Sequence, residues 1–391
     1  MTVRPMDIAP AGRIELPDSG LKAGWEGIVL LGLTIVLLTI GLVTLYSASS
    51  VLALRQNLPD TFYVLRQASG AVMGMGALAF FAWLPYSVLD RWSWPILWAS
   101  VIPLIVIVLP GTESIAPEIN GARRWLDIGV RVQPSDFAKV SVVLWTASMA
   151  VKKAPHFKSL SKGLAPFLVI WCVLLLPIAL EPDLSTAVVV ALLGVMVLFA
   201  AGARIGHFVF LGLLSLPFLQ HQLQVGFRAD RLSAFLDPAS DPSGAGFQVH
   251  QSLVALGSGG VTGVGIGEGR QKFGFLPEAH NDFIFAMIGE EFGLIGSLLL
   301  ISLYIAIVAV GFRIATRAQD LFGQLIAIGF SNLIALQAVL HMSVGLGLVP
   351  PTGLALPLVS YGRSNLIVTL AAIGILISVS RSARGGKGAR A

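Results

Sequence analysis

Residues Pro277–Gly296 read PEAHNDFIFAMIGEEFGLIG. Here a polar segment gives way to an apolar run that continues to about residue 312 and is long enough to cross a bilayer as a helix. Asp282 stands at the boundary, and Glu290 and Glu291 follow about two helical turns later. Carboxylates at or within a membrane span are costly and are usually functional. Asp282 is therefore the first candidate for a functional residue.

The composition extends this interpretation to the whole chain. Of its 391 residues 55% are hydrophobic and only 12% are charged, and the mean hydropathy is +0.82. Soluble domains carry roughly twice that share of charge, so the chain is expected to be an all-α polytopic membrane protein. Windows of about 20 apolar residues predict about ten transmembrane helices. They lie near residues 25–48, 65–85, 93–110, 136–151, 164–181, 184–201, 205–221, 283–312, 323–348 and 358–380.

The charge pattern predicts how these helices are oriented. Ten spans place both termini on one side, and basic residues are more numerous on that side, so the positive-inside rule makes the termini cytoplasmic. We expect a cytoplasmic tail (1–24), a single transmembrane domain (25–380) and a basic cytoplasmic tail (381–391). Two extracytoplasmic loops would interrupt the domain, at about 111–135 and, between the seventh and eighth spans, at about 222–281.

The first of these loops leads into Asn120–Lys139, NGARRWLDIGVRVQPSDFAK. Its Arg123 and Arg124 suit a membrane interface, either as snorkelling side chains or as ligands of a phosphate. After the loop, Asp136 and Lys139 are spaced i, i+3 on a helix. Their pairing would make a lysine tolerable near the bilayer.

Two further polar segments fall at the same side. The turn Glu181–Thr186, EPDLST, carries Asp183; it is either a solvated turn or a wall of an outer cavity facing Lys139 or Arg124. In the longest loop, Arg228 and Arg231 are spaced i, i+3 among apolar residues, as in an amphipathic segment on a membrane surface. Such a segment suits a lipid-linked diphosphate, or it is a plain interfacial helix.

The glycines of Ser258–Gly269 lack the lysine and flanking strand of a phosphate-binding loop, and they favour close backbone packing instead. In the stretch first quoted, Asp282 is expected at the N-terminus of a helix, where a carboxylate is also a good first-turn residue and the helix dipole would stabilise it. Glu290 and Glu291 would lie roughly 12 Å deeper and be buried and partnered, away from Asp282. Gly289, Gly293 and Gly296 would let another helix approach closely.

Val349–Asn365, VPPTGLALPLVSYGRSN, ends the series. Its prolines and glycines predict irregular backbone at the outer end of the last helices, which is tolerated only where protein buries it or water reaches it. Because all these motifs fall on one side, they predict a single extracytoplasmic site for an anionic, membrane-anchored substrate, with one well-placed carboxylate.

These motifs resemble the SEDS family of polytopic peptidoglycan glycosyltransferases, over nearly the whole chain. The resemblance rests on NGARRW, QPSDFAK, EPDLST, GFQVHQSLVALGSGG, LPEAHNDFIFA and LPLVSYG, and it favours the FtsW branch over the RodA branch. It implies that Asp282 is the essential acid. Four residues depart from the usual pattern: Asn281, His341, Arg363 and Asn365.

The resemblance implies an inverting polymerase of lipid II on the outer face of the bacterial cytoplasmic membrane, in septal wall synthesis. Alternatives are a RodA-like elongation polymerase, a lipid II flippase and an inactive division scaffold. Expected partners are a class B penicillin-binding transpeptidase, other divisome proteins and the membrane, without nucleic acid. The reaction is expected with or without a divalent cation (Mg or Mn), which no sequence motif indicates. We expect Asp282 to be catalytic and the substrate to be bound by Arg123, Arg124, Lys139, Asp183, Arg228, Arg231, Glu278, His280 and Ser360.

Overall fold

The computed structural model describes residues 24–118, 122–127, 129, 131–157, 163–223, 226–236 and 244–385. They form the α-helices α1 (Trp25–Arg55), α2 (Phe62–Trp83), α3 (Tyr86–Val108), α4 (Pro134–Lys153), α5 (Ala165–Leu180), α6 (Leu184–Ala200), α7 (Ile205–Leu223), α8 (Gly226–Leu236), α9 (Ala245–Gly259), α10 (Ile284–Arg317), α11 (Leu321–Gly345) and α12 (Arg363–Gly385). Short 3₁₀ turns, η1 (Ala154–His156) and η4 (Gln271–Phe273), follow α4 and precede α10. Strands β1 (Leu126–Asp127) and β2 (Arg131–Val132) form a small antiparallel hairpin.

Each predicted span coincides with one of these helices. Within the described ranges, six helices are long and apolar enough to cross a membrane: α1, α2, α3, α10, α11 and α12. Helices α5, α6 and α7 are shorter apolar helices, so the total of ten transmembrane helices stays a prediction. The hairpin is a small exception to the all-α expectation, and α9 in the longest loop was not predicted.

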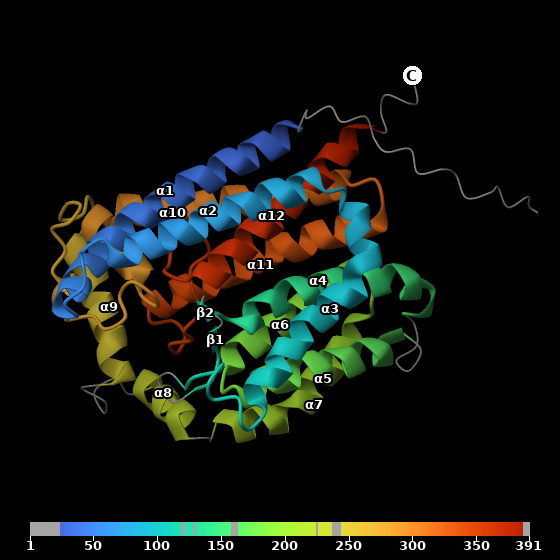
Figure 1. Ribbon diagram of the computed structural model, residues 1–391, viewed down its shortest axis with the longest axis horizontal. Helices are drawn as coiled ribbons and strands as arrows, with labels where there is room; N and C mark the ends of the chain where they lie inside the picture. Colours follow the sequence, from blue (N-terminus) through green and yellow to red (C-terminus); the bar gives the residue numbers. More distant parts are fainter. Residues whose placement is uncertain are drawn as a thin grey trace, which may run out of the picture.

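The helices form two groups that share one core. Figure 1 shows α1, α2, α10, α11 and α12 running side by side along the long axis, with α3 to α7 beside them. Helix α12 is the central helix, because 89% of its span is buried against only 33% for α1. A continuous cluster of buried apolar side chains joins both groups.

The two ends of the described chain lie together at one end of the molecule. Gly24 lies beside the backbone of Ser380, and Glu26 at the start of α1 pairs with Arg317 at the end of α10. Because α10 begins at Ile284, the Asp282 segment lies at the opposite end. This arrangement agrees with both termini being on one side of a membrane.

Helix α10 is not the continuous helix that its apolar pattern predicts. Gly293 has φ +66° and ψ −163°, which breaks the helix. The break separates the carbonyls of Glu290 and Glu291 from the N–H groups of Leu294 and Ile295, which an unbroken helix would pair.

The loop after α9 replaces the lost hydrogen bonds. Val264 and Gly265 donate to the Glu290 and Glu291 carbonyls (3.0 and 3.1 Å), while the carbonyls of residues 260 and 261 accept from Leu294 and Ile295 (3.0 and 3.1 Å). Unpaired backbone groups are very costly in an apolar environment, so this exchange makes the break stable. The close approach predicted for the glycines of residues 258–269 is confirmed, since a Cβ on Gly263 would lie 2.2 Å from the Glu291 carbonyl oxygen.

Helix α4 contains the predicted ion pair. Pro134 occupies its first turn, and the Lys139 ammonium lies 2.7 Å from an Asp136 carboxylate oxygen. Both side chains are almost fully buried, with exposed fractions of 3% and 6%. Each charge is therefore tolerable only because the other is present.

Replacing Gly263 with alanine should destabilise the fold. The residue has φ +83°, and the added Cβ would collide with the Glu291 carbonyl, so we expect a loss of about 2 kcal/mol or more in the free energy of unfolding. Gly257→Ala is the matched control, because no atom lies within 4 Å of its added Cβ. Thermal melting of the detergent-solubilised protein measures the difference, and equal melting of the two variants would contradict this account of the break.

Removing only Lys139 should be far more harmful than removing the whole pair. Lys139→Met leaves the Asp136 carboxylate buried without its cation, which costs about 3–5 kcal/mol. The double variant Asp136→Leu with Lys139→Met should recover most of that loss, as measured by the same melting experiment. If the single variant melts like the wild type, the pair does not stabilise α4.

Candidate active site

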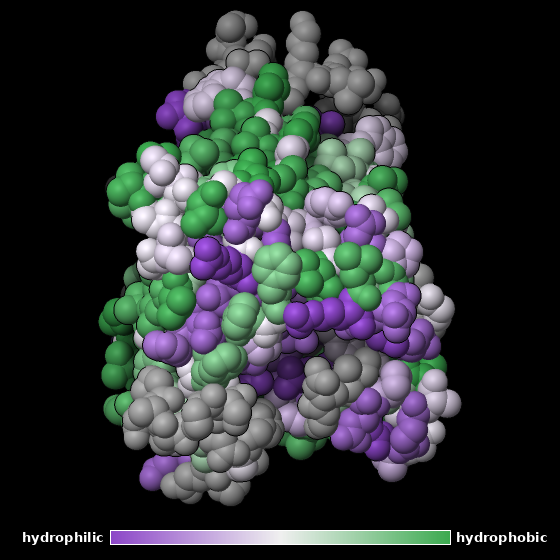
Figure 2. Space-filling model, turned by 90° about the vertical axis from the view of Figure 1, so that its left-hand side faces the viewer, coloured by the Kyte–Doolittle hydropathy of each residue, from purple (hydrophilic) through white to green (hydrophobic). Residues whose placement is uncertain are grey.

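The loop that carries Asp282 is tied together by its own hydrogen bonds. The Glu278 carbonyl accepts from the N–H groups of Asn281 and Asp282, both at 3.0 Å, and the Asn281 amide donates to the Glu278 carboxylate at 2.7 Å. Helix α10 begins only at Ile284, with Phe283 as its N-cap. Asp282 therefore lies at the N-terminal end of the helix, as predicted, and directly precedes the N-cap, so its carboxyl group is presented by the loop. Figure 2 shows hydrophilic residues around a recess on this end of the molecule.

The turn between α5 and α6 holds Arg124. The guanidinium donates to the carbonyl of Pro182 (2.7 Å) and to that of Glu181 (3.3 Å). Glu181 and Asp183 are buried, with exposed fractions of 2% and 6%. The solvated-turn interpretation is therefore wrong, and the turn faces Arg124 as the alternative predicted.

Asp183 connects three helices at this end. It caps α6 by accepting from the Thr186 N–H at 3.1 Å, and its other carboxylate oxygen accepts from the Gln133 amide at 3.3 Å. The Gln133 backbone N–H donates to the hydroxyl of Ser364 in α12 at 3.1 Å. The starts of α4, α6 and α12 are thus fixed relative to one another.

Charges from separate segments interact around Asp282. The carboxyl group is only partly exposed, and its burial raises its pKa to about 6, with the Glu278 carboxylate adding to the rise and Arg231 and Arg124 opposing it. Burial lowers the pKa of Arg231, and the negative charge of Asp282 partly offsets this by raising it. Arg231, on α8, also donates to the Pro351 carbonyl at 3.4 Å. Two cations from separate segments, Arg124 and Arg231, therefore act electrostatically on Asp282.

An aromatic cluster supports the same loop. The His280 ring lies 5.0 Å from the Tyr63 ring on α2 and 5.7 Å from the Tyr361 ring. The Tyr361 N–H donates to the His280 carbonyl at 3.1 Å. Burial lowers the pKa of His280, so its imidazole is neutral at pH 7 and packs as a ring. His280 therefore anchors the loop two residues before Asp282.

Glu181 is a neutral acid beside the arginine. Within the described part of the chain, neither oxygen of its carboxyl group has a hydrogen-bond partner. Burial raises its pKa to about 9, and the Asp183 carboxylate adds to this rise. At pH 7 the group is protonated and does not neutralise Arg124.

Other predicted site residues lie in different surroundings. Lys139 is engaged with Asp136, and Arg123 pairs with Glu113 at 3.0 Å on an exposed surface. The Ser360 hydroxyl accepts from the Leu356 N–H at 2.9 Å, so it closes a turn. The Arg228 side chain lies outside the described residues.

Glu290 and Glu291 are partnered, as predicted. Glu290 accepts from the Arg270 N–H at 2.7 Å, and Glu291 accepts from the Ser47 hydroxyl. Glu290 therefore holds the loop after α9, and Glu291 joins α10 to α1.

The unusual residues find partners within the fold. Arg363 lies against Gly70 of α2, where a Cβ would meet its side chain at 3.0 Å. Asn365 accepts from the Gln337 amide at 3.1 Å, and a ring nitrogen of His341 lies 2.8 Å from the Leu354 carbonyl oxygen. The contacts of these three residues are thus with α2, α11 and the segment before α12, and not with Asp282.

No group of three or more His, Cys, Asp or Glu side chains is arranged to hold a metal ion among the described residues. Sequence reasoning missed Gln133, Glu181, Tyr63 and Tyr361. Glu181 belongs to the EPDLST motif, but nothing in the sequence indicates that its side chain is buried. The tyrosines occur far from Asp282 in the chain, and only the tertiary structure brings them to His280.

Comparison with known proteins identifies the family to which this chain belongs. The cell cycle protein family model of FtsW, RodA and SpoVE matches residues 28–385. A probable peptidoglycan glycosyltransferase FtsW of Trichlorobacter lovleyi is 39% identical over 370 residues, covering 94% of this chain and 96% of the relative. The stage V sporulation protein E of Bacillus subtilis is 39% identical over 359 residues, covering 91% and 97%.

Two solved structures share the fold. A chain described under "Structural coordination of polymerization and crosslinking by a peptidoglycan synthase complex" has a TM-score of 0.76 at 28% identity, covering 93% of this chain and 99% of that one. The rod shape determining protein RodA of Thermus thermophilus has a TM-score of 0.68 at 26% identity, covering 93% and 98%. The chain therefore belongs to the FtsW, RodA and SpoVE family, the SEDS family of polytopic membrane proteins.

Proposed function

We propose that this protein is a peptidoglycan glycosyltransferase that polymerises lipid II on the outer face of the cytoplasmic membrane during septal wall synthesis. The observation that carries the proposal is the interaction of one carboxyl group, Asp282, with two cations, Arg124 and Arg231. The names of the FtsW relatives support the reaction class.

Asp282 would act as the general base. It takes the proton from the acceptor sugar hydroxyl, whose oxygen attacks the anomeric carbon of the donor. The bond from that carbon to the diphosphate breaks, and the diphosphate leaves with the electron pair, inverting the configuration. A diphosphate needs charge stabilisation more than a proton, so one carboxylate with cations suffices, whereas glycoside hydrolysis usually takes two carboxylates.

Arg124 and Arg231 would stabilise the leaving diphosphate. Among the residues that the structure describes, Arg124 is bound by carbonyl oxygens and not by a carboxylate, so its positive charge is available to an anion. Arg123, Arg228 and Lys139 stay in the proposal as residues at or near the path of the substrate, with Lys139 acting through its pair with Asp136. A divalent cation remains compatible with the proposal as an additional charge on the diphosphate.

The partner would be a class B penicillin-binding transpeptidase. A similar chain was solved in a peptidoglycan synthase complex that couples polymerisation with crosslinking. In this arrangement ten helices span the membrane, both termini are cytoplasmic and the Asp282 end faces outward to the septum with other division proteins.

Asp282→Asn should abolish polymerisation. Removing a general base costs typically about 100-fold or more in rate. The assay follows labelled lipid II in proteoliposomes containing the protein with its transpeptidase partner, and gel analysis measures the glycan formed. The control is Glu268→Gln, an exposed acid in the loop after α9. Normal polymerisation by the Asn variant would exclude Asp282 as the base, and transport of lipid II without glycan product would favour a flippase.

The pH dependence should report the ionisation of Asp282. Because the base must be deprotonated and its pKa is about 6, the rate should rise about tenfold per unit below pH 6 and level off above it. Arg231 lowers this pKa and Glu278 raises it. Arg231→Gln should therefore move the acidic limb to higher pH, and Glu278→Gln should move it to lower pH. If the acidic side of the pH–rate profile does not shift in either variant, Asp282 is not the group whose ionisation it reports.

A further inference from the structure

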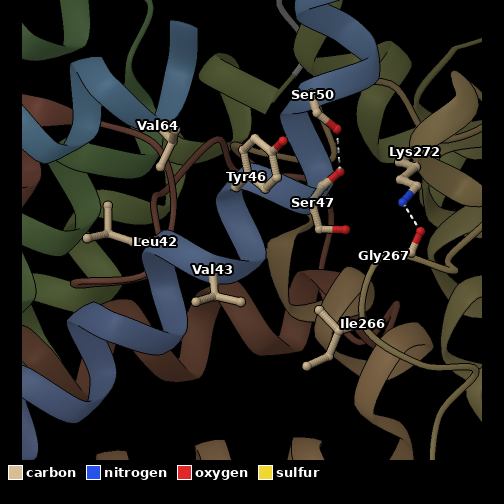
Figure 3. A pocket seen from close by; sticks show the side chains of 9 residues that line it. All are labelled: Leu42, Val43, Tyr46, Ser47, Ser50, Val64, Ile266, Gly267 and Lys272. Carbon is tan, nitrogen blue, oxygen red and sulfur yellow. Dashed lines mark hydrogen bonds between the residues drawn. The ribbon is translucent and has the colours of Figure 1, made fainter. Parts of the chain in front are cut away.

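A pocket whose lining does not include Asp282 lies between α1, α2 and the loop after α9. Its volume is about 530 Å³, in the range of cavities that hold small ligands. Figure 3 shows the side chains of this α1–α2 pocket. It is lined by Leu42, Val43, Tyr46, Ser47, Ser50, Val64, Ile266, Gly267 and Lys272.

Apolar side chains at the pocket face outward. Val43 of α1 and Ile266 of the loop are 44% and 61% exposed. Other apolar side chains of the same loop are also exposed, namely Val261, Val264, Phe273 and Phe275. In a membrane protein, a helix and a loop that expose apolar groups side by side form a surface suited to the hydrocarbon of the bilayer.

The other end of the pocket is positive. Lys272 donates from its ammonium to the Gly267 carbonyl, which leaves further N–H donors on the same group. The lining contains this one cation and no carboxylate. Acids behind the wall are already bonded: Glu291 accepts from Ser47, and Asp60 accepts from Tyr46 at 2.9 Å.

We propose that the α1–α2 pocket binds one anionic phospholipid, with an acyl chain between Val43, Val64 and Ile266 and the headgroup phosphate at Lys272. An apolar cleft that opens to the bilayer and has a single cation at its polar end matches this chemistry. A zwitterionic headgroup would leave its own cation without a partner, because no acid lines the pocket. The inference does not depend on the proposed glycosyltransferase activity.

The bound lipid would contact the segment that leads to the active-site loop. Glu290 holds the N–H groups of Arg270 and Gln271, and the Gln271 carbonyl accepts from Leu276 at 3.2 Å. The next residues form the loop that ends at Asp282. The pocket and the catalytic loop are therefore neighbours along a short, hydrogen-bonded stretch of chain.

Native mass spectrometry of the full-length protein tests the proposal. Protein in detergent receives equal amounts of phosphatidylglycerol and phosphatidylcholine, and the retained lipid is identified. The wild type should retain one phosphatidylglycerol in preference. Lys272→Gln should reduce that preference about fivefold, while Arg270→Gln, which removes an exposed cation two residues away, should not. Val43→Trp, which fills the apolar end, should lose the retained lipid whatever its headgroup.

Several outcomes would overturn the inference. One is an equal effect of Lys272→Gln and Arg270→Gln, and another is full lipid retention by Val43→Trp. A third arm adds a polyprenyl phosphate: if it occupies the site at lower concentration than phosphatidylglycerol, the ligand is a prenyl lipid. A photo-crosslinker at Ile266 that captures a helix of the transpeptidase partner would identify a protein interface instead. Because every readout is binding, a failure here is separate from a failure of the polymerisation assay.

Discussion

The fold depends on pairing the backbone groups that the break in α10 exposes. In hydrocarbon an unpaired N–H or carbonyl costs several kcal/mol, so a helix can break there only where another segment replaces its hydrogen bonds. The loop after α9 does this on both sides of Gly293. The same loop then continues through η4 to the residues that carry Asp282. The position of the loop that carries Asp282 is therefore a consequence of how the backbone groups at the break in α10 are paired.

The few buried charges follow a similar rule. Lys139 and Asp136 neutralise each other inside α4, and Glu290 uses its carboxyl group to hold backbone N–H groups. Around Asp282, by contrast, the acting cations Arg124 and Arg231 come from segments that are distant in the sequence. This convergence of distant segments distinguishes the site from the Asp136–Lys139 pair and from Glu290.

The sequence predicted the parts that follow from local chemistry. The apolar windows located the helices, and the i, i+3 spacing predicted the Asp136–Lys139 pair. The window that begins at residue 283 lies one residue before the observed start of α10 at Ile284. The break at Gly293 was missed, since a positive φ at a glycine within an apolar run depends on the loop that packs against it. The burial of Glu181 likewise depends on α5 and α6 together.

The protonation of Glu181 bears on how the site can bind an anion. A carboxylate beside Arg124 would compensate the guanidinium and weaken its attraction for a diphosphate. Burial raises the pKa of Glu181 to about 9, so at pH 7 the neighbouring acid is neutral. Arg124 is instead oriented by the carbonyls of Glu181 and Pro182, which fix its direction without cancelling its charge. The turn between α5 and α6 thus positions a cation whose charge is not cancelled by Glu181. Asp282, the proposed base, has a pKa of about 6 and is ionised beside it at neutral pH.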